Sequence, residues 1–237
     1  MAEAAAAAGG TRAMARDDFT EERARLVEEI SAYAYHTGER TGRKSFSAKV
    51  MEAMHQVPRH EFVPLEIRRF SYINRPLPIG MDATISQPFI VALMTDLADI
   101  GPDDNVLEIG TGAGYQAAIL SLLAKRVASV EINEELEARA KKRLTRLGYG
   151  KIETRVGDGY YGWPDRGPFD AILVTTAPDL IPPPLFEQLG PRGRMVIPAG
   201  LPDSQKLLRV TRNAQGRFET TEILEVAFSQ LQRAGHA

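Results

Sequence analysis

VLEIGTGAGY, residues 106–115, is the stretch that decides the fold. A short apolar run ends in closely spaced glycines and leads into an amphipathic segment, which predicts a strand, a tight turn and a helix. Gly110 and Gly112 let the backbone turn sharply and let a ligand approach without a Cβ in the way. In open α/β sheets such a turn lies at the carboxyl ends of the strands, where ligands bind.

The same alternation of short apolar runs and amphipathic stretches continues to about residue 200. Strands are expected at 105–110, 127–132, 152–156, 169–174 and 194–199, with helices at 115–125, 134–147 and 184–189. This rhythm predicts an α/β fold with a doubly wound, mostly parallel sheet, Rossmann-like, with helices on both faces. Two further strands, at 206–211 and 221–228, follow each other without a helix. They predict an antiparallel C-terminal edge.

The residues ahead of this core predict N-terminal helices joined by irregular segments. A capping box of Asp18 and Glu21 is expected to begin a helix that runs to about Tyr35. The remaining expectations are a basic loop at 36–44, a helix at 47–56, irregular stretches at 57–64 and 75–88, and a helix starting near Pro88.

The chain is expected to hold one folded domain behind a short tail. Residues 1–17, rich in Ala and Gly, are expected to be disordered. Residues 18–237 are expected to form a single domain. Its parts are an N-terminal helical and loop region on the substrate side (18–100), a cofactor-binding core (101–200) and C-terminal strands (201–237).

The composition excludes several kinds of functional site and argues against several classes of protein. Apolar residues make up 43% of 237 residues, which suffices for a packed core, and the net charge of −2 gives no strongly basic face for nucleic acid. The absence of cysteine excludes disulfides, thiolate metal sites and a cysteine nucleophile, and the four histidines lack metal-ligand spacing. No apolar run is long enough to span a membrane, and the start MAEAAAAAGG lacks the basic segment of a signal peptide. We therefore expect a cytoplasmic protein without metal, membrane or nucleic-acid partner, and we expect a monomer.

Three loops after successive strands carry the cofactor prediction. The glycine spacing is GxGxG, and Tyr115 stands where a dinucleotide fingerprint has its third glycine, which disfavours a nicotinamide dehydrogenase. Glu131 ends the second strand 21 residues after Gly110 (131 − 110), the separation of a carboxylate that accepts from ribose hydroxyls. Asp158, between two glycines after the third strand, could accept from the amino group of adenine. Each loop also has a purely structural alternative. The glycine loop could be a packing turn between strand and helix, Glu131 could cap the helix that begins after Asn133, and the loop with Asp158 could be an ordinary turn.

Taken together, these loops resemble those of class I S-adenosylmethionine-dependent methyltransferases. More specifically, the chain resembles the protein-L-isoaspartate O-methyltransferases from about residue 47 to residue 228. The family-specific segment is DATISQPFIVALM (82–94), ahead of VLEIGTGAGYQAA (106–118). The other matching stretches are VPRHEFVP (57–64), RPLPIG (75–80), GDGYYGWP (157–164), PFDAILVTTAP (168–178) and GRMVIPAG (193–200).

The resemblance implies that the protein methylates the free α-carboxylate of L-isoaspartyl residues in damaged proteins, using S-adenosylmethionine and releasing S-adenosylhomocysteine. The ester then collapses to a succinimide, whose hydrolysis returns some normal aspartate. In the family, the Ser of the T-I-S-x-P motif lies beside the reacting groups; here it is Ser86. A carboxylate with a pKa near 4 needs no general base at neutral pH, so Ser86 would position it by hydrogen bonding. Ser86 also precedes Pro88 as a helix N-cap would. The residues expected to bind the cofactor are Thr84, Gln87, Glu108, Gly110, Gly112, Glu131, Asp158 and Gly159.

Two regions depart from the family pattern. The segment at 28–54 is longer and more basic than the family's short Gly-Ile linker, and the tail at 226–231 reads VAFSQL where the family has V-x-F-V-P-L. Because the family's tail helps to close the site, a methyltransferase of the same fold with a different acceptor is the main alternative. A non-catalytic module with a vestigial nucleoside fold is another.

Overall fold

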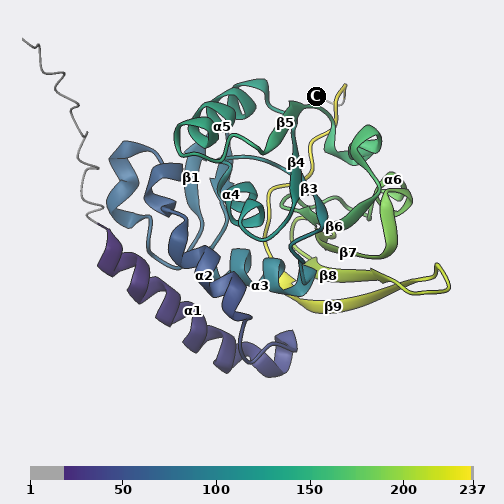
Figure 1. Cartoon of the computed structure of the whole chain (residues 1–237), viewed down its shortest axis with the longest axis horizontal. Coiled ribbons are helices and arrows are strands. Elements are labelled where there is room, and N and C mark those ends of the chain that lie inside the picture. Colours follow the sequence, from purple (N-terminus) through teal and green to yellow (C-terminus); the bar gives the residue numbers. More distant parts are fainter. Residues whose placement is uncertain (1–18, 236–237) are drawn as a thin grey trace, which may run out of the picture.

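The computed structural model describes residues 19–235 (Figure 1). The expected disordered tail at 1–17 and Asp18 of the expected capping box lie outside these residues. Within them, one seven-stranded sheet runs through the molecule in the order β5-β4-β3-β6-β7-β8-β9, beside a separate two-stranded hairpin. The strands of the large sheet are β3 (Asn105–Ile109), β4 (Arg126–Glu131), β5 (Glu153–Val156), β6 (Phe169–Val174), β7 (Leu189–Ala199), β8 (Gln205–Arg212) and β9 (Phe218–Val226).

The strand directions confirm the predicted topology. β5, β4, β3, β6 and β7 pair in parallel, whereas β8 pairs antiparallel with β7 and with β9. The chain builds outward from β3 to β5 on one side and from β6 to β9 on the other. The strand order therefore reverses between β3 and β6, which is where doubly wound sheets bind their ligands.

Apolar side chains alternate between the two faces of the sheet, as they must when both faces are covered. Val106 belongs to the core beneath the larger group of helices, whereas its neighbour Leu107 belongs to the core on the opposite face. That opposite core includes Leu185 of α6 (Pro183–Glu187). The helices of the larger group are α1 (Thr20–Thr41), α2 (Ala48–Gln56), α3 (Pro88–Ala98), α4 (Tyr115–Ser121) and α5 (Glu134–Arg146).

The first helix is longer than predicted. Its last residue is Thr41, with Gly42 in the left-handed conformation at its C-terminus, so most of the expected loop at 36–44 is helical. A Cβ added at Gly38 would lie 2.4 Å from Cγ of Lys44. The chain that follows the helix folds back so closely at this position that a side chain would not fit, and this close contact cannot be recognised from the sequence alone.

The expectation that residues 75–88 hold no regular element is also wrong. They contain an antiparallel hairpin of β1 (Leu77–Gly80) and β2 (Ala83–Ile85), joined through Met81 and Asp82, both with positive φ. The strands are short, and Pro78 and Gly80 are unusual in strands, so the composition gives no clear strand pattern. Short 3-10 helices, Arg59–Phe62 and Leu65–Phe70, occupy much of the stretch between α2 and this hairpin.

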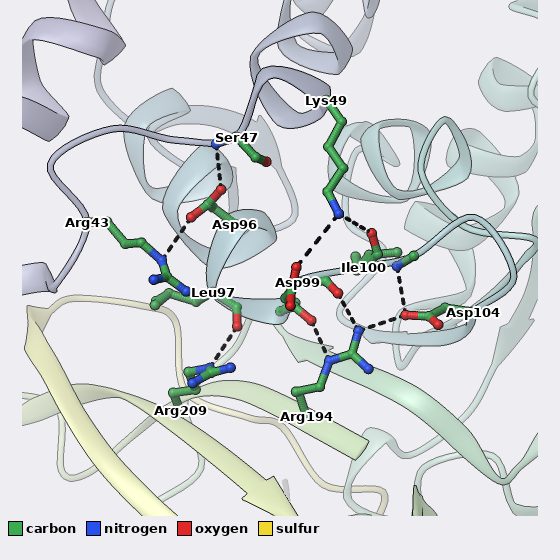
Figure 2. A network of polar contacts seen from close by, with 12 residues as sticks. Arg43, Ser47, Lys49, Asp96, Leu97, Asp99, Ile100, Asp104, Arg194 and Arg209 are labelled. Atoms are coloured by element: carbon green, nitrogen blue, oxygen red, sulfur yellow. Dashed lines mark hydrogen bonds and ion pairs between the residues drawn. The ribbon is translucent and has the colours of Figure 1, made fainter. Parts of the chain in front are cut away.

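A polar network holds the C-terminal end of α3 (Figure 2). Two arginines of the sheet donate to its last carbonyl groups: Arg194 Nε to Ala98 at 2.8 Å, and Arg209 Nε to Leu97 at 2.9 Å. Positive side chains at this end also oppose the partial negative charge of the helix. The network fixes the helix whose other end follows the T-I-S-Q segment.

The same network anchors the connection between α1 and α2. Asp96 of α3 pairs with Arg43 Nε at 2.9 Å and accepts from the backbone N–H of Ser47 at 2.8 Å (Figure 2). Lys49 of α2 donates to the carbonyl of Ile100 at 2.7 Å. The basic connection between α1 and α2 is therefore tied to α3.

None of the helices in residues 19–235 is both long and apolar enough to cross a membrane.

Candidate functional site

A cleft of about 660 Å³ opens at the carboxyl edge of β3 and β4. The glycine turn and the hairpin segment both line it, together with α1 and the C-terminal tail from Leu224 to Gln232. Eight of the nine predicted site residues line the cleft: Thr84, Ser86, Gln87, Glu108, Gly110, Gly112, Glu131 and Gly159. The exception is Asp158. Residues from regions far apart in the sequence therefore meet where the topology predicts a ligand.

The turn after β3 requires glycine for two different reasons. Gly110 has φ 94°, and a Cβ there would lie 2.5 Å from Oγ1 of Thr175, so a side chain would be strained and would collide. Thr175 Oγ1 in turn donates to the carbonyl of Gly110 at 2.8 Å, which links β3 to the end of β6. Gly112 also has positive φ, but an added Cβ would make only ordinary contact, with Ile79 Cδ1 at 3.6 Å. Glycine is therefore favoured at Gly112 by the backbone conformation and not by lack of space.

Glu131 lies at the end of β4 with only 6% of its surface exposed. Its Oε2 accepts from the backbone N–H of Gly112 at 2.8 Å, and its Oε1 accepts from that of Asn133 at 3.1 Å. The cap of α5 is instead made by Asn133, whose Oδ1 accepts from two N–H groups of the first turn. Each Glu131 oxygen keeps a further lone pair, so the carboxylate can accept from two more hydroxyl groups.

Glu108 is fully buried on β3 and accepts from Ser129 Oγ through Oε2. Burial raises the pKa of Glu108 to about 8, and the negative charge of Glu131 acts in the same direction. The hydrogen bond from Ser129 lowers the pKa and only partly offsets these effects. The side chain is therefore mostly protonated at neutral pH. Its Oε1 has no hydrogen-bond partner among the described residues, so it is an orphaned buried polar atom at the wall of the cleft.

Asp158 is engaged by the C-terminal tail. Its side chain is 8% exposed; Oδ1 accepts from the N–H of Tyr160 at 3.0 Å, and Oδ2 accepts from Arg233 Nε at 3.0 Å and from the N–H of Ala234 at 3.2 Å. The Arg233 guanidinium also lies 3.6 Å from the centre of the Tyr160 ring. A carboxylate has about four lone-pair positions, so about one remains for another donor. Gly159 lines the cleft directly beside this contact.

Ser86 is held through its backbone. The fully buried Arg59 donates from Nη2 to the Ser86 carbonyl at 2.8 Å and from Nε to the Ser71 carbonyl at 2.9 Å. Burial lowers the pKa of Arg59 to about 10, and its guanidinium lies 5.0 Å from the centre of the Tyr115 ring. The anchor therefore remains charged at neutral pH.

The expectation that Ser86 caps α3 is wrong. Asn74 Oδ1 accepts from the N–H of Phe89 at 3.0 Å, while Gln87 Nε2 donates to the Asn74 carbonyl at 3.1 Å. Asn74 thus supplies the capping oxygen from an earlier loop. Among residues 19–235, the Ser86 hydroxyl makes no hydrogen bond to another residue, so it can serve a ligand in the cleft.

The C-terminal tail, predicted from the sequence to depart from the family pattern, runs along the cleft. Ala177, just past β6, forms a parallel bridge with Gln230, accepting from the N–H of Leu231 and donating to the carbonyl of Ser229, each at 2.9 Å. Gln205 Nε2 donates to the carbonyl of Phe228 at 2.9 Å and Gln205 Oε1 accepts from its N–H at 2.6 Å. Backbone contacts of this kind do not depend on a Val-Pro pair.

Sequence reasoning missed Arg59 and the residues of α1 that line the cleft. Arg59 lies in VPRHEFVP, a stretch predicted only to be irregular, and because His60 and Glu61 follow it directly, no local pattern marks Arg59 as buried. The cleft-lining residues of α1 are Tyr33, Thr37, Arg40 and Thr41, which recur at helical spacing. No cluster of three or more potential metal ligands occurs in residues 19–235.

Comparisons with known proteins agree with this geometry. The family model of protein-L-isoaspartate(D-aspartate) O-methyltransferase matches residues 37–234. A Polaromonas protein-L-isoaspartate O-methyltransferase 1 is 51% identical over 95% of both chains, and a Syntrophobacter fumaroxidans protein-L-isoaspartate O-methyltransferase 2 is 52% identical over 97% of this chain and 93% of the relative. A solved protein-L-isoaspartate O-methyltransferase superposes with a TM-score of 0.75 at 29% identity, covering 88% of this chain and 65% of that one. A putative Plasmodium falciparum member in complex with S-adenosyl-L-homocysteine shares the fold, with a TM-score of 0.73 at 21% identity.

Proposed function

This chain belongs to the protein-L-isoaspartate(D-aspartate) O-methyltransferase family, and we propose that the cleft described above is where it carries out the reaction. The enzyme transfers a methyl group from S-adenosylmethionine to the free α-carboxylate of L-isoaspartyl residues, which initiates protein repair through a succinimide. The observation that carries the assignment of the site is that the glycine turn with Glu131 and the segment with Ser86 line one cleft.

The residues on the sheet side fit a nucleoside cofactor. Glu131 is held by two backbone N–H groups and still has lone pairs for two ribose hydroxyls. Gly112 lines the cleft without a side chain, and the orphaned Oε1 of Glu108 is a further polar atom at the wall. Glu108, Gly110, Gly112 and Glu131 are thus proposed to hold the ribose and amino-acid portion, with Asp158 and Gly159 at the adenine end. When bound, S-adenosylmethionine supplies an electrophilic methyl group on a sulfonium.

On the acceptor side, the chain needs to position an oxygen that is already nucleophilic. The substrate carboxylate is ionised at neutral pH, so orientation and exclusion of water are the remaining tasks. We assign Ser86 to hydrogen bonding of that carboxylate, since its hydroxyl is uncommitted and its backbone is anchored by Arg59. Thr84 and Gln87, which line the same cleft, are proposed to contact the cofactor.

A comparison of substrate and cofactor binding tests this assignment of the site. Ser86→Ala is expected to lower methyl transfer to an isoaspartyl peptide while S-adenosylhomocysteine binds as before. Because α3 is capped by Asn74, this variant should keep the fold. If Ser86→Ala retains full turnover, the acceptor lies elsewhere and the proposed site is wrong.

We also propose that the enzyme works as a cytoplasmic monomer without nucleic-acid or membrane partners. Support comes from a near balance of 29 Lys and Arg against 31 Asp and Glu, which offers no excess positive charge to a polyanion. Light scattering of the purified chain should give the mass of one copy, and cell fractionation should recover the activity in the cytosol. A dimeric mass or a membrane-bound activity would contradict the proposal.

A further inference from the structure

One face of the N-terminal helix forms part of the cleft wall. Tyr33, Thr37 and Arg40 are spaced by four and three residues, so they lie on the same side of α1, and all three line the cleft. The Tyr33 ring packs edge-on against Phe89 of α3, with the centroids 4.6 Å apart.

Arg40 is the only basic residue among the described residues that line the cleft. Three other charged side chains line the same cleft, and all of them are carboxylates: Asp82, Glu131 and Glu225; Glu108 also lines it but is mostly protonated at neutral pH. Without Arg40, a substrate that carries a carboxylate into this cleft would meet only negatively charged side chains. Arg40 therefore supplies the positive charge that an anionic acceptor requires from the protein.

The guanidinium of Arg40 is available for such a contact. The side chain is exposed, and within residues 19–235 it makes no hydrogen bond or ion pair. The chain just beyond it is fixed, because Arg43 pairs with Asp96 of α3 (Figure 2). A basic residue in the last helical turn also opposes the helix dipole, but that role leaves the donors of the guanidinium free.

We propose that Arg40 binds a carboxylate of the isoaspartyl peptide and thereby determines substrate affinity. The inference rests on the proposed function of the cleft. The carboxylate belongs either to the isoaspartyl acceptor itself or to an acidic residue beside it in the peptide. A planar guanidinium suits either one, because it can donate two parallel hydrogen bonds to a carboxylate.

Steady-state kinetics of Arg40→Gln with two isoaspartyl peptides test the proposal. One peptide has neutral neighbours, and the other carries a glutamate next to the isoaspartyl residue. We expect KM to rise roughly tenfold, the loss of one charge-assisted contact in an open site, with kcat and the Kd of S-adenosylhomocysteine unchanged. A rise with both peptides identifies the acceptor carboxylate, whereas a rise confined to the second peptide identifies the flanking one. Arg40→Lys keeps the positive charge but cannot donate two parallel hydrogen bonds, so its KM should rise less.

Arg25→Gln is the matched control, since it removes the same charge from an exposed position of α1 that does not line the cleft. An unchanged KM in Arg40→Gln, or an equal rise in Arg25→Gln, would overturn the role of Arg40. Parallel loss of S-adenosylhomocysteine affinity would also overturn it, since the arginine would then serve the cofactor. Failure of the wild-type protein to methylate either peptide would instead refute the proposed function.

Discussion

Replacement of Glu131 by alanine should weaken cofactor binding more than any other single change at the sheet side of the cleft. The carboxylate is nearly buried, and each oxygen already accepts from one backbone N–H, at 2.8 and 3.1 Å. Two lone-pair positions therefore remain for two ribose hydroxyls. A hydrogen bond to a charged group contributes about 1.5–3 kcal/mol, so the pair contributes about 3–6 kcal/mol. The low end of that range corresponds to about a 100-fold rise in Kd.

Calorimetric titration with S-adenosylhomocysteine measures this change directly. Glu131→Ala also leaves the N–H groups of Gly112 and Asn133 without their acceptor, so its Tm should fall, and the titration must be run well below that Tm. Glu131→Gln keeps one carbonyl oxygen and should bind with a Kd between those of the wild type and the alanine variant.

Glu134→Ala is the matched control. It removes a carboxylate from an exposed position three residues along, in the first turn of α5, where it contributes only to the helix dipole. Its Kd should equal that of the wild type. If Glu131→Ala is folded and binds S-adenosylhomocysteine within twofold of the wild type, Glu131 does not contact the ribose and the reasoning fails.

Three further predictions concern the acceptor side and the core. Ser86→Ala should lower kcat by tenfold or more, and equal losses of kcat and cofactor affinity would make Ser86 merely structural. Arg59→Lys cannot hold the carbonyls of Ser71 and Ser86 together, so both Tm and kcat should fall, and a thermal melt at the wild-type Tm would contradict this. The pKa of Glu108 is about 8 in the folded state and about 4.5 in the unfolded state, so the folded protein holds this proton to a higher pH. Its contribution to stability is therefore full below pH 4.5 and is lost as the pH rises to 8. Glu108→Gln should flatten the decline in Tm between pH 5 and pH 8, and an unchanged slope would refute the shifted pKa.

The sheet could be predicted from the sequence because its signals are local. Each strand of the core is a short apolar run next to an amphipathic helix, and the order of such runs restricts the topology strongly. The glycine turn and Glu131 follow from the same pattern, since they lie at strand ends. All five parallel strands were predicted within a few residues, apart from the earlier start of β7 at Leu189.

The features that sequence reasoning missed depend on tertiary contacts. The need for glycine at position 38 within α1 comes from Lys44 packing against it, and the cap of α3 comes from Asn74 rather than from Ser86. The contact of Arg59 with the Ser86 carbonyl spans 27 residues, and that of Asp158 with the tail spans 75. No local sequence pattern predicts contacts between residues this far apart. The part of the cleft wall that α1 and the tail form therefore could not be predicted from the sequence.

The most direct test of the central claim is the transfer of labelled methyl from S-adenosylmethionine to a matched pair of peptides. The two peptides share one sequence and differ only in whether a single residue is L-isoaspartate or L-aspartate. The account predicts a labelled, base-labile ester on the isoaspartyl peptide and none above background on the aspartyl peptide. Absence of label on the isoaspartyl peptide, from protein that binds S-adenosylhomocysteine, would contradict it.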